Sequence, residues 1–503
     1  MYSGVSGLKA HQTRMDVIGN NIANVNTNGF KKSRVVFADT LYQNMRYSIP
    51  PSDTKGGTNP MGVGLGSQVA SVDQIMTSSP TTTTNKTTDM AVSGNGYFIV
   101  KDGDEQYFSR VGAFDWDKAY NLVNSNGYKV QGWMANTDPA RATADGDFSI
   151  DSSGVITALN IADYKEISPR VTKNVILTGN LDSDYAIPQV TNATPPPTQV
   201  DIDPAATAAA NQQFPAETDE VKTFPIQVYD SLGREQTVYM RFFKVTPTVD
   251  GAGNATANNW ACDISLSPLF DRDSAYDPNT NFTTSTDLSD AALTDVAAVT
   301  LNEPNDVVRV YNLQFDSDGN FATPDELFRG KISLTLNQHT FATMPVQTTQ
   351  EALSKDVTCT IDLTGVTQYD GTDSIHFDKQ DGYAAGSMVK YSVGTDGTII
   401  AVYDNEQTKS IARVALASFD NPSGLQQVGG TMWQTSVNSG NAVIGQPGKE
   451  GKGAIVPSAL EMSNVDLSEE FTDMIVTERG FQANSRIITT SDEMLQELVN
   501  LKR

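Results

Sequence analysis

The residues of this chain that could do chemistry do not complete a catalytic or metal-binding motif. Residues 316–320 (DSDGN) resemble the start of a calcium loop, but Phe321 and Leu327 stand where an EF-hand needs glycine and glutamate. Residues 62–66 (GVGLG) resemble a phosphate cradle, but no lysine or strand–loop–helix pattern accompanies them. A hairpin turn and a flexible loop are the simpler interpretations.

Cysteines, histidines and carboxylates also fail to define a reactive centre. The two cysteines, Cys262 and Cys359, form no CxxC motif, and the three histidines are far apart in the sequence. We favour two buried free thiols, with one disulfide or one reactive thiol as alternatives. Carboxylates are abundant, but nothing singles out a catalytic pair. We therefore expect no enzymatic activity, no cofactor and no metal site.

The charge balance indicates which partners this chain can have. Asp and Glu number 60 against 35 Lys and Arg, so the formal net charge is −25. A charge of this sign repels nucleic acid and anionic lipid. No apolar run of 18 residues is present, so we expect no membrane insertion. The first 30 residues lack a continuous apolar core, so if the chain leaves the cell, we expect it to do so without a cleaved signal peptide.

Apolar side chains recur at helical spacing near both ends of the chain. This spacing gives a narrow stripe, as in a coiled-coil seam, and predicts helices over 3–27 and from Leu467 to Lys502. Asn464 and Asp466 are the candidate N-caps of the second helix. The predicted assembly residues are Leu8, Met15, Ile18, Ile22 and Val25 in the first helix, and Leu467, Phe471, Met474, Phe481, Ile488, Leu495 and Val499 in the last.

The charges of the two ends favour their pairing. Residues 1–34 carry five basic side chains against one acidic, and residues 460–503 carry nine acidic against four basic. Opposite charges suit two helices lying side by side, although each exposed pair contributes little. One helix pair buries too few stripe side chains to offset the entropy of ordering both ends. We predict that both ends are disordered in the monomer and fold when neighbouring copies cover them.

The body between these ends is β-like and nested. Short alternating strands flank turn signals such as 102–104 and 125–127, and low-complexity runs interrupt the middle of the chain. The predicted fold is mainly β with terminal α-helices, in which an inserted outer β domain interrupts an inner one. The expected divisions are 1–34 with 460–503 (coiled-coil-like helical assembly domain), 35–67 (linker or extended segment), 68–170 with 361–440 (inner β domain), 171–360 (outer β domain) and 441–459 (Gly-rich linker).

Several long motifs carry a family resemblance. Residues 3–8 (SGVSGL) and 16–31 (DVIGNNIANVNTNGFK) resemble the N-terminal signature of bacterial flagellar axial proteins, the rod, hook and hook-associated proteins. Residues 93–98, 131–133, 459–467 and 479–484 resemble further shared segments. The residues that match the first signature most distinctively are Asn20, Asn21, Asn24, Asn26, Gly29 and Phe30.

Within that group the chain is similar to the hook proteins. Residues 224–245 resemble their outer domain, whereas rod proteins are shorter and lack such an insert. The resemblance implies a structural subunit that polymerises with itself into a flexible curved tube, a universal joint that transmits torque from rod to filament. It also implies a place outside the cell, in the basal body and hook.

The implied partners are further copies of the chain, the rod protein, the hook cap protein, the hook–filament junction protein and the flagellar type III export apparatus. The alternatives are a distal rod or hook-associated axial protein, or, from another class, a secreted β-rich adhesin. An adhesin would not need the paired end helices.

Overall fold

The computed structural model describes residues 2–53, 55–136, 149–186, 222–244, 248–249, 255–266, 282–287, 297–301, 307–315, 318–322, 330–336 and 357–501. The chain divides into two compact units. The first comprises Met1–Lys165, Val389–Val402 and Thr408–Arg503, and the second comprises Glu166–Met388 with Tyr403–Gln407. The second unit is therefore inserted into the first.

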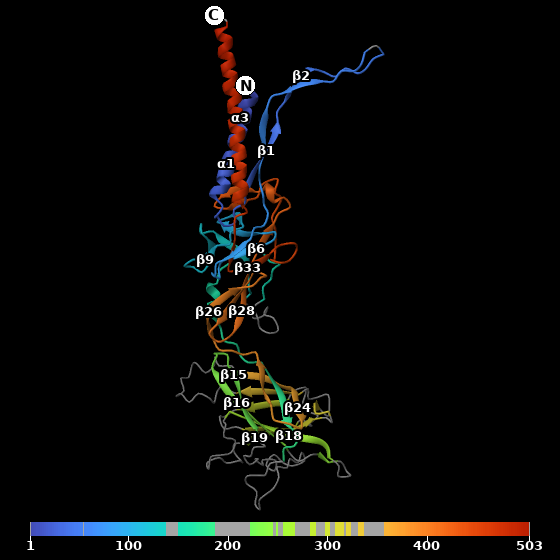
Figure 1. Ribbon diagram of the computed structural model, residues 1–503. Coiled ribbons are helices and arrows are strands. Elements are labelled where there is room, and N and C mark those ends of the chain that lie inside the picture. Colours follow the sequence, from blue (N-terminus) through green and yellow to red (C-terminus); the bar gives the residue numbers. More distant parts are fainter. Residues whose placement is uncertain are drawn as a thin grey trace, which may run out of the picture. The chain divides into compact units, whose positions relative to one another are not determined.

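The first unit contains two long helices and a set of short strands (Figure 1). The helices are α1 (Tyr2–Ala23) and α3 (Leu467–Asn500). The strands are β1 (Ser33–Asp39), β2 (Tyr42–Arg46), β3 (Met61–Gly64), β4 (Ser67–Gln74), β5 (Thr81–Thr83), β6 (Met90–Ser93), β7 (Tyr97–Asp102), β8 (Glu105–Ser109), β9 (Phe114–Trp116), β10 (Leu122–Asn124), β11 (Lys129–Met134), β12 (Thr157–Ala158), β27 (Thr398–Tyr403), β28 (Thr408–Val414), β29 (Leu416–Ser418), β30 (Gln426–Gly429), β31 (Met432–Gln434), β32 (Val443–Gly445), β33 (Ala454–Pro457) and β34 (Ala459–Glu461).

Local hydrogen bonds mark the start of α3 and the end of α1. Asp466 is the N-cap of α3, because its carboxylate accepts hydrogen bonds from the amides of Ser468 and Glu469. Helix α1 ends at Ala23, earlier than the predicted residue 27, and beyond it the amides of Val25 and Thr27 bond the carbonyls three residues back, those of Ile22 and Asn24, as in a turn. Val25, predicted to belong to the helix, therefore lies in the turn beyond it.

The main sheet of the first unit joins strands from both halves of the sequence. Its order is β27-β28-β11-β7-β8-β31-β30, with β29 beside β7. The two predicted hairpins are confirmed, since β7 pairs with β8 and β10 pairs with β11. A buried aromatic cluster includes Phe108 of β8, Trp433 of β31 and Phe419, which follows β29. Strands β33 and β34 pair with β6 and β5, so the chain entering α3 is hydrogen-bonded to the segment that follows α1.

Two segments expected as linkers contain paired strands. Residues 33–74 form a long ribbon, in which β1 pairs with β4 and β2 pairs with β3. Residues 441–459 contain β32 and β33, which pair with β29 and β6. In both segments the backbone is held by cross-strand hydrogen bonds, although glycine and proline suggested irregular structure.

The second unit is a β-sandwich in which buried side chains of two sheets interdigitate. One sheet has the order β15-β16-β18-β21-β19 and the other β20-β23-β24-β14-β25. The strands are β13 (Glu166–Ile167), β14 (Asn174–Asp182), β15 (Lys222–Tyr229), β16 (Glu235–Lys244), β17 (Thr248–Val249), β18 (Ala255–Ser265), β19 (Phe282–Asp287), β20 (Ala297–Leu301), β21 (Val307–Phe315), β22 (Phe321–Ala322), β23 (Lys331–Leu336), β24 (Val357–Tyr369), β25 (His376–Gln380) and β26 (Gly386–Val393), which continues into the first unit.

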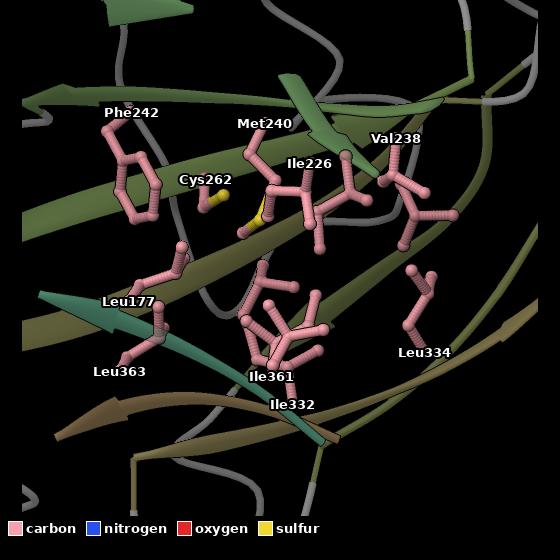
Figure 2. Close-up of a cluster of buried hydrophobic side chains, with 14 of the residues drawn as sticks. Leu177, Ile226, Val238, Met240, Phe242, Cys262, Ile332, Leu334, Ile361 and Leu363 are labelled. Atoms are coloured by element: carbon pink, nitrogen blue, oxygen red, sulfur yellow. The ribbon is translucent and has the colours of Figure 1, made fainter. Parts of the chain in front are cut away.

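The sandwich core explains several details that the sequence left open. Figure 2 shows Ile226, Met240 and Cys262 from one sheet facing Leu177 and Ile361 from the other. Both cysteines are buried and free, as favoured above. The expected return to the inner domain at residue 361 occurs at 389, because β24 pairs in parallel with β14 and so belongs to the sandwich. In the supposed calcium loop, residues 316 and 317 lie outside the described residues.

One carboxylate is buried inside the sandwich between two arginines. Asp263 is fully buried and bonds Arg309 at 2.6 Å and Arg241 at 2.8 Å. Burial alone would raise the pKa of Asp263, but the two guanidinium groups outweigh burial and hold that pKa below its usual value. A carboxyl with a depressed folded-state pKa stabilises the fold above its unfolded pKa of about 3.9 and loses that contribution as the pH falls further.

We predict that Asp263→Asn lowers the free energy of unfolding of the second unit by about 3–5 kcal/mol at pH 7, because it removes the buried negative charge that the guanidinium groups of Arg241 and Arg309 bond. It should also flatten the loss of stability below about pH 4. Reaction of Cys262 and Cys359 with a thiol reagent in urea measures opening of this unit. Lys331→Ala, which breaks a partly exposed pair with Asp362, is the control and should cost at most about 1 kcal/mol. Equal effects of the two changes would contradict the prediction.

Candidate assembly interface

The two end helices pair antiparallel along their length. Near one end of the pair, Asn21 bonds Glu470 at 3.1 Å, and further along, Arg14 bonds Asp473 at 2.9 Å. At the other end, Gly4 lies against Ile488. Residue numbers thus rise on α1 as they fall on α3, and Figure 1 shows the two helices side by side.

Small and polar residues make this contact. A Cβ on Gly7 would come within 2.9 Å of Oδ1 of Asn484, and one on Gly480 within 2.7 Å of Cε1 of His11. The helices therefore approach closely only because glycine stands at these points. The seam residues recur at steps of three and four, and they are Gly4, Gly7, His11, Arg14, Ile18 and Asn21 on α1, and Glu470, Asp473, Thr477, Gly480 and Asn484 on α3.

His11 lies inside this seam and keeps it free of an extra charge. Its ring packs edge-on against Phe37 of β1, with ring centroids 5.7 Å apart. Burial, assisted by the neighbouring Arg14 charge, lowers the pKa of His11. The imidazole is therefore neutral at pH 7, and the seam carries the single ion pair of Arg14 with Asp473 at this level.

The predicted assembly residues mostly lie beside this seam. Ile18 is buried, with 3% of its surface exposed. Leu8, Met15, Ile22, Val25, Met474, Phe481 and Ile488 are half-buried. Leu467, Phe471, Leu495 and Val499 are exposed, with exposed fractions of 39%, 50%, 49% and 67%. Ile475, Val476, Met494 and Leu498 add to the exposed apolar surface of α3. That these side chains mediate assembly between copies stays a prediction.

The asparagine-rich motif at the end of α1 and in the turn after it connects the helix pair to the body of the first unit. The side chain of Asn21 donates to the carbonyl of Ser33 and to Glu470 and accepts from the amide of Ser33. Asn24 donates to Asn20. Gly29 has φ +66°, a backbone conformation that favours glycine, and its amide bonds the carbonyl of Glu461. Phe30 is buried, whereas Asn20 and Asn26 are exposed.

A buried ionic cluster lies at the base of the helix pair. Glu461 bonds Lys31 at 2.7 Å and Arg110 at 2.9 Å, and at most 4% of each of the three side chains is exposed. Lys31 also donates to the carbonyl of Thr77, and Arg110 to that of Gly94. Burial lowers the pKa of Lys31, although its bond to Glu461 opposes this effect. We call Lys31, Glu461 and Arg110 the junction cluster.

The sequence analysis missed both the seam and the junction cluster. Lys31 and Glu461 entered only as charges in a sum and as members of the family segments 16–31 and 459–467, and glycines carry no hydrophobic signal. The spacing of small residues, Gly4 and Gly7 on one helix and Gly480 on the other, was the available signal for close helix packing. Each side chain of the junction cluster is far from the others in sequence, so no local pattern could have revealed it.

The chemistry that this region supports is association. Within the described ranges, no cluster of three or more histidine, cysteine or acidic side chains is placed to hold a metal ion. Neither helix, α1 or α3, is long and apolar enough to span a membrane. What α3 does present is a row of exposed apolar side chains, which water disfavours and a second protein surface can cover.

Family comparisons assign the class. Residues 1–31 match the family described as flagella basal body rod protein, and residues 456–501 match the C-terminal family of flagellar basal body rod FlgEFG proteins. Residues 91–158 match the flagellar hook protein FlgE/F/G D1 domain, and residues 202–383 match the flagellar basal body protein FlaE D2 domain. These matches define an axial protein of the bacterial flagellum.

Full-length relatives narrow the class further. The flagellar hook protein FlgE of Borreliella burgdorferi is 36% identical over 100% of this chain and 99% of its own. That of Treponema pallidum is 35% identical with the same coverage, and that of Escherichia coli K12 is 30% identical over 99% and 98%. The chain belongs to the family of flagellar hook proteins, a structural family rather than a family of enzymes.

We predict that Glu461→Ala lowers the free energy of unfolding of the first unit by about 3–5 kcal/mol, because Lys31 and Arg110 would be buried without their anion. Hydrogen exchange of β7 and β8, measured in rising urea, reports this change. Glu469→Ala is the control. It removes a 2.6 Å ion pair with Lys32, but the Glu469 side chain is 61% exposed, so the change should lower the free energy of unfolding by at most about 1 kcal/mol. The prediction fails if both substitutions change exchange equally.

Proposed function

We propose that this chain is a hook subunit that polymerises through its end helices into a flexible curved tube. Homologues named flagellar hook protein FlgE across the full length of the chain support a hook subunit. The main support for this mode of assembly is that α3 has two different faces. Its small and polar side chains face α1, while Phe471, Ile475 and Leu498 stay exposed for other copies.

The proposed tube works as a universal joint that transmits torque from rod to filament. In a curved rotating tube, each row of subunits lengthens and shortens once per turn. Such motion needs firm contacts near the axis and contacts farther out that can slide. Apolar helix faces suit the firm contacts, and an acidic body with a net charge of −25 suits the sliding ones, since no apolar lock must break.

The remaining partners belong to the same proposal. Subunits would leave the cell through the flagellar type III export apparatus without a cleaved signal peptide and would assemble beneath a hook cap protein. The rod protein would bind one end of the tube and the hook–filament junction protein the other. Helix ends that hold together by a weak polar seam would open readily for passage of an extended chain and close again in the polymer.

Electron microscopy of the purified full chain under polymerising conditions tests the proposal directly. We expect short curved tubes. Straight rods would favour a rod protein, and the absence of any ordered polymer at high concentration would contradict self-assembly.

We predict that Phe471→Ala raises the critical concentration for tube formation by about tenfold. Phe471 is 50% exposed, and covering the rest of a side chain of this size contributes roughly 1–1.5 kcal/mol. Sedimentation of polymer at a series of protein concentrations measures the change. Phe377→Ala is the matched control, since Phe377 is a 37% exposed phenylalanine on β25 in the other unit. A normal critical concentration for Phe471→Ala would contradict the role of α3.

A further inference from the structure

The outer part of the ribbon is an isolated two-stranded sheet with one open apolar face. Every residue of β2 and β3 is exposed. Leu41, Met61, Val63 and Leu65 lie on one face, with exposed fractions of 80%, 49%, 51% and 44%, and Gln43 lies opposite Val63 on the same face. On the other face, Tyr42 and Asn44 cover Gly64 and Gly62. Two strands alone are at most marginally stable in water, so the open face requires a cover.

Helix α3 has an equally open surface in its last turns. The steps of three and four that place Asp473, Thr477, Gly480 and Asn484 against α1 continue through Ile487, Ser491, Met494, Leu498 and Leu501. Gly4 lies at the level of Ile488, and in the part of α1 that the structure describes only Ser3 and Tyr2 precede it, Tyr2 being itself 89% exposed. There the seam changes from polar to apolar, and Met494, Leu498 and Leu501 are 59%, 62% and 82% exposed.

Both open surfaces leave the same end of the helix pair. The outer part of the ribbon, residues 40–66, is rooted at Gly66. A Cβ on Gly66 would meet Oγ of Ser6 and Cα of Ser3 in the first turns of α1. Thr40 holds this root by donating its amide and hydroxyl to the carbonyl of Gly66, each at 3.0 Å. From there the ribbon points away from the α3 of its own chain in Figure 1. The two faces of one chain are thus close at their roots but not in contact.

Resting on the proposed self-assembly, we propose that the β2–β3 ribbon of one copy lies on the apolar end of α3, residues 489–501, of a second copy. In this contact the ribbon face of Leu41, Val63 and Leu65 covers the helix stripe of Met494, Leu498 and Leu501, so that both apolar surfaces are removed from water.

The charges of the two surfaces agree with this pairing. The ribbon between residues 40 and 66 carries Arg46 and Lys55 against Asp53. The charged residues of 489–501 are all acidic, namely Asp492, Glu493 and Glu497. The contact therefore combines apolar burial with attraction between opposite charges, which sets the orientation of the two elements more than the strength of the contact.

Disulfide trapping tests this contact in the assembled protein. Cys262 and Cys359 are buried, so introduced cysteines are the accessible thiols. Chains with Val63→Cys are mixed with chains carrying Leu498→Cys, assembled, checked for tubes by electron microscopy and treated with a mild oxidant. We expect reducible dimers from the mixture, and a ladder of multiples from the double variant. Val437→Cys mixed with Leu498→Cys is the control, since Val437 is fully exposed in a turn of the first unit, and should give no dimer.

Each other outcome overturns the inference in a distinct way. Tubes without dimers would show that the ribbon lies elsewhere, while the proposed self-assembly stands. A cross-link within single chains of the double variant in dilute solution would mean that each ribbon covers its own helix. Dimers from Leu8→Cys with Leu498→Cys, but none with Val63→Cys, would assign the cover to α1 of the second copy. The cysteine variants could also fail to form tubes while the unaltered chain forms them. In that case we expect Val63→Asp to block assembly and Val437→Asp to leave it intact. Tubes from Val63→Asp together with none from Val437→Asp would contradict the contact.

Discussion

The structure depends on how the two end helices share their surfaces. Within one chain most of the seam residues are small or polar, with one arginine–aspartate pair and one buried isoleucine, Ile18. The leucine, phenylalanine and isoleucine side chains of α3 are left exposed. Because apolar burial is the main source of stability for a helix pair, we propose that other copies supply much of that stability. In the proposed mode of assembly, neighbouring copies cover the apolar side chains that the single chain leaves exposed.

The junction cluster determines where order in a single chain can begin. Glu461 joins Lys31, from the segment after α1, to Arg110 of the inner β domain, and the pairing of β34 with β5 holds the same point. The bases of α1 and α3 are therefore tied to a folded body, while their far ends depend on the polar seam. The helix pair is thus well buried at its base and exposed at its far end. An exposed far end suits a subunit that has to join a polymer. The ribbon belongs to the same exposed end.

Much of the architecture could be predicted from the sequence because its signals are local. Apolar spacing located both helices, Asp466 was a candidate cap, and turn residues located the two hairpins of the inner domain. The seam face gives no hydrophobic period, because most of its residues are glycine, threonine, asparagine and charged residues, so only the spacing of its glycines marks it in the sequence. The end of the inserted unit was placed too early because the parallel pairing of β14 with β24 joins segments nearly 200 residues apart. Lys31 gave no sign of burial, since its partners come from distant parts of the chain.

Hydrogen exchange on the same protein, as a dilute monomer and as assembled tubes, tests the central claim most directly. The account predicts that amides of residues 489–501 exchange freely in the monomer and become strongly protected in the tube. Amides of β34, beside the junction cluster, should be protected in both states. Strong protection of 489–501 in a verified monomer would contradict the account, because it would mean that a single chain already covers the surface assigned to its neighbours.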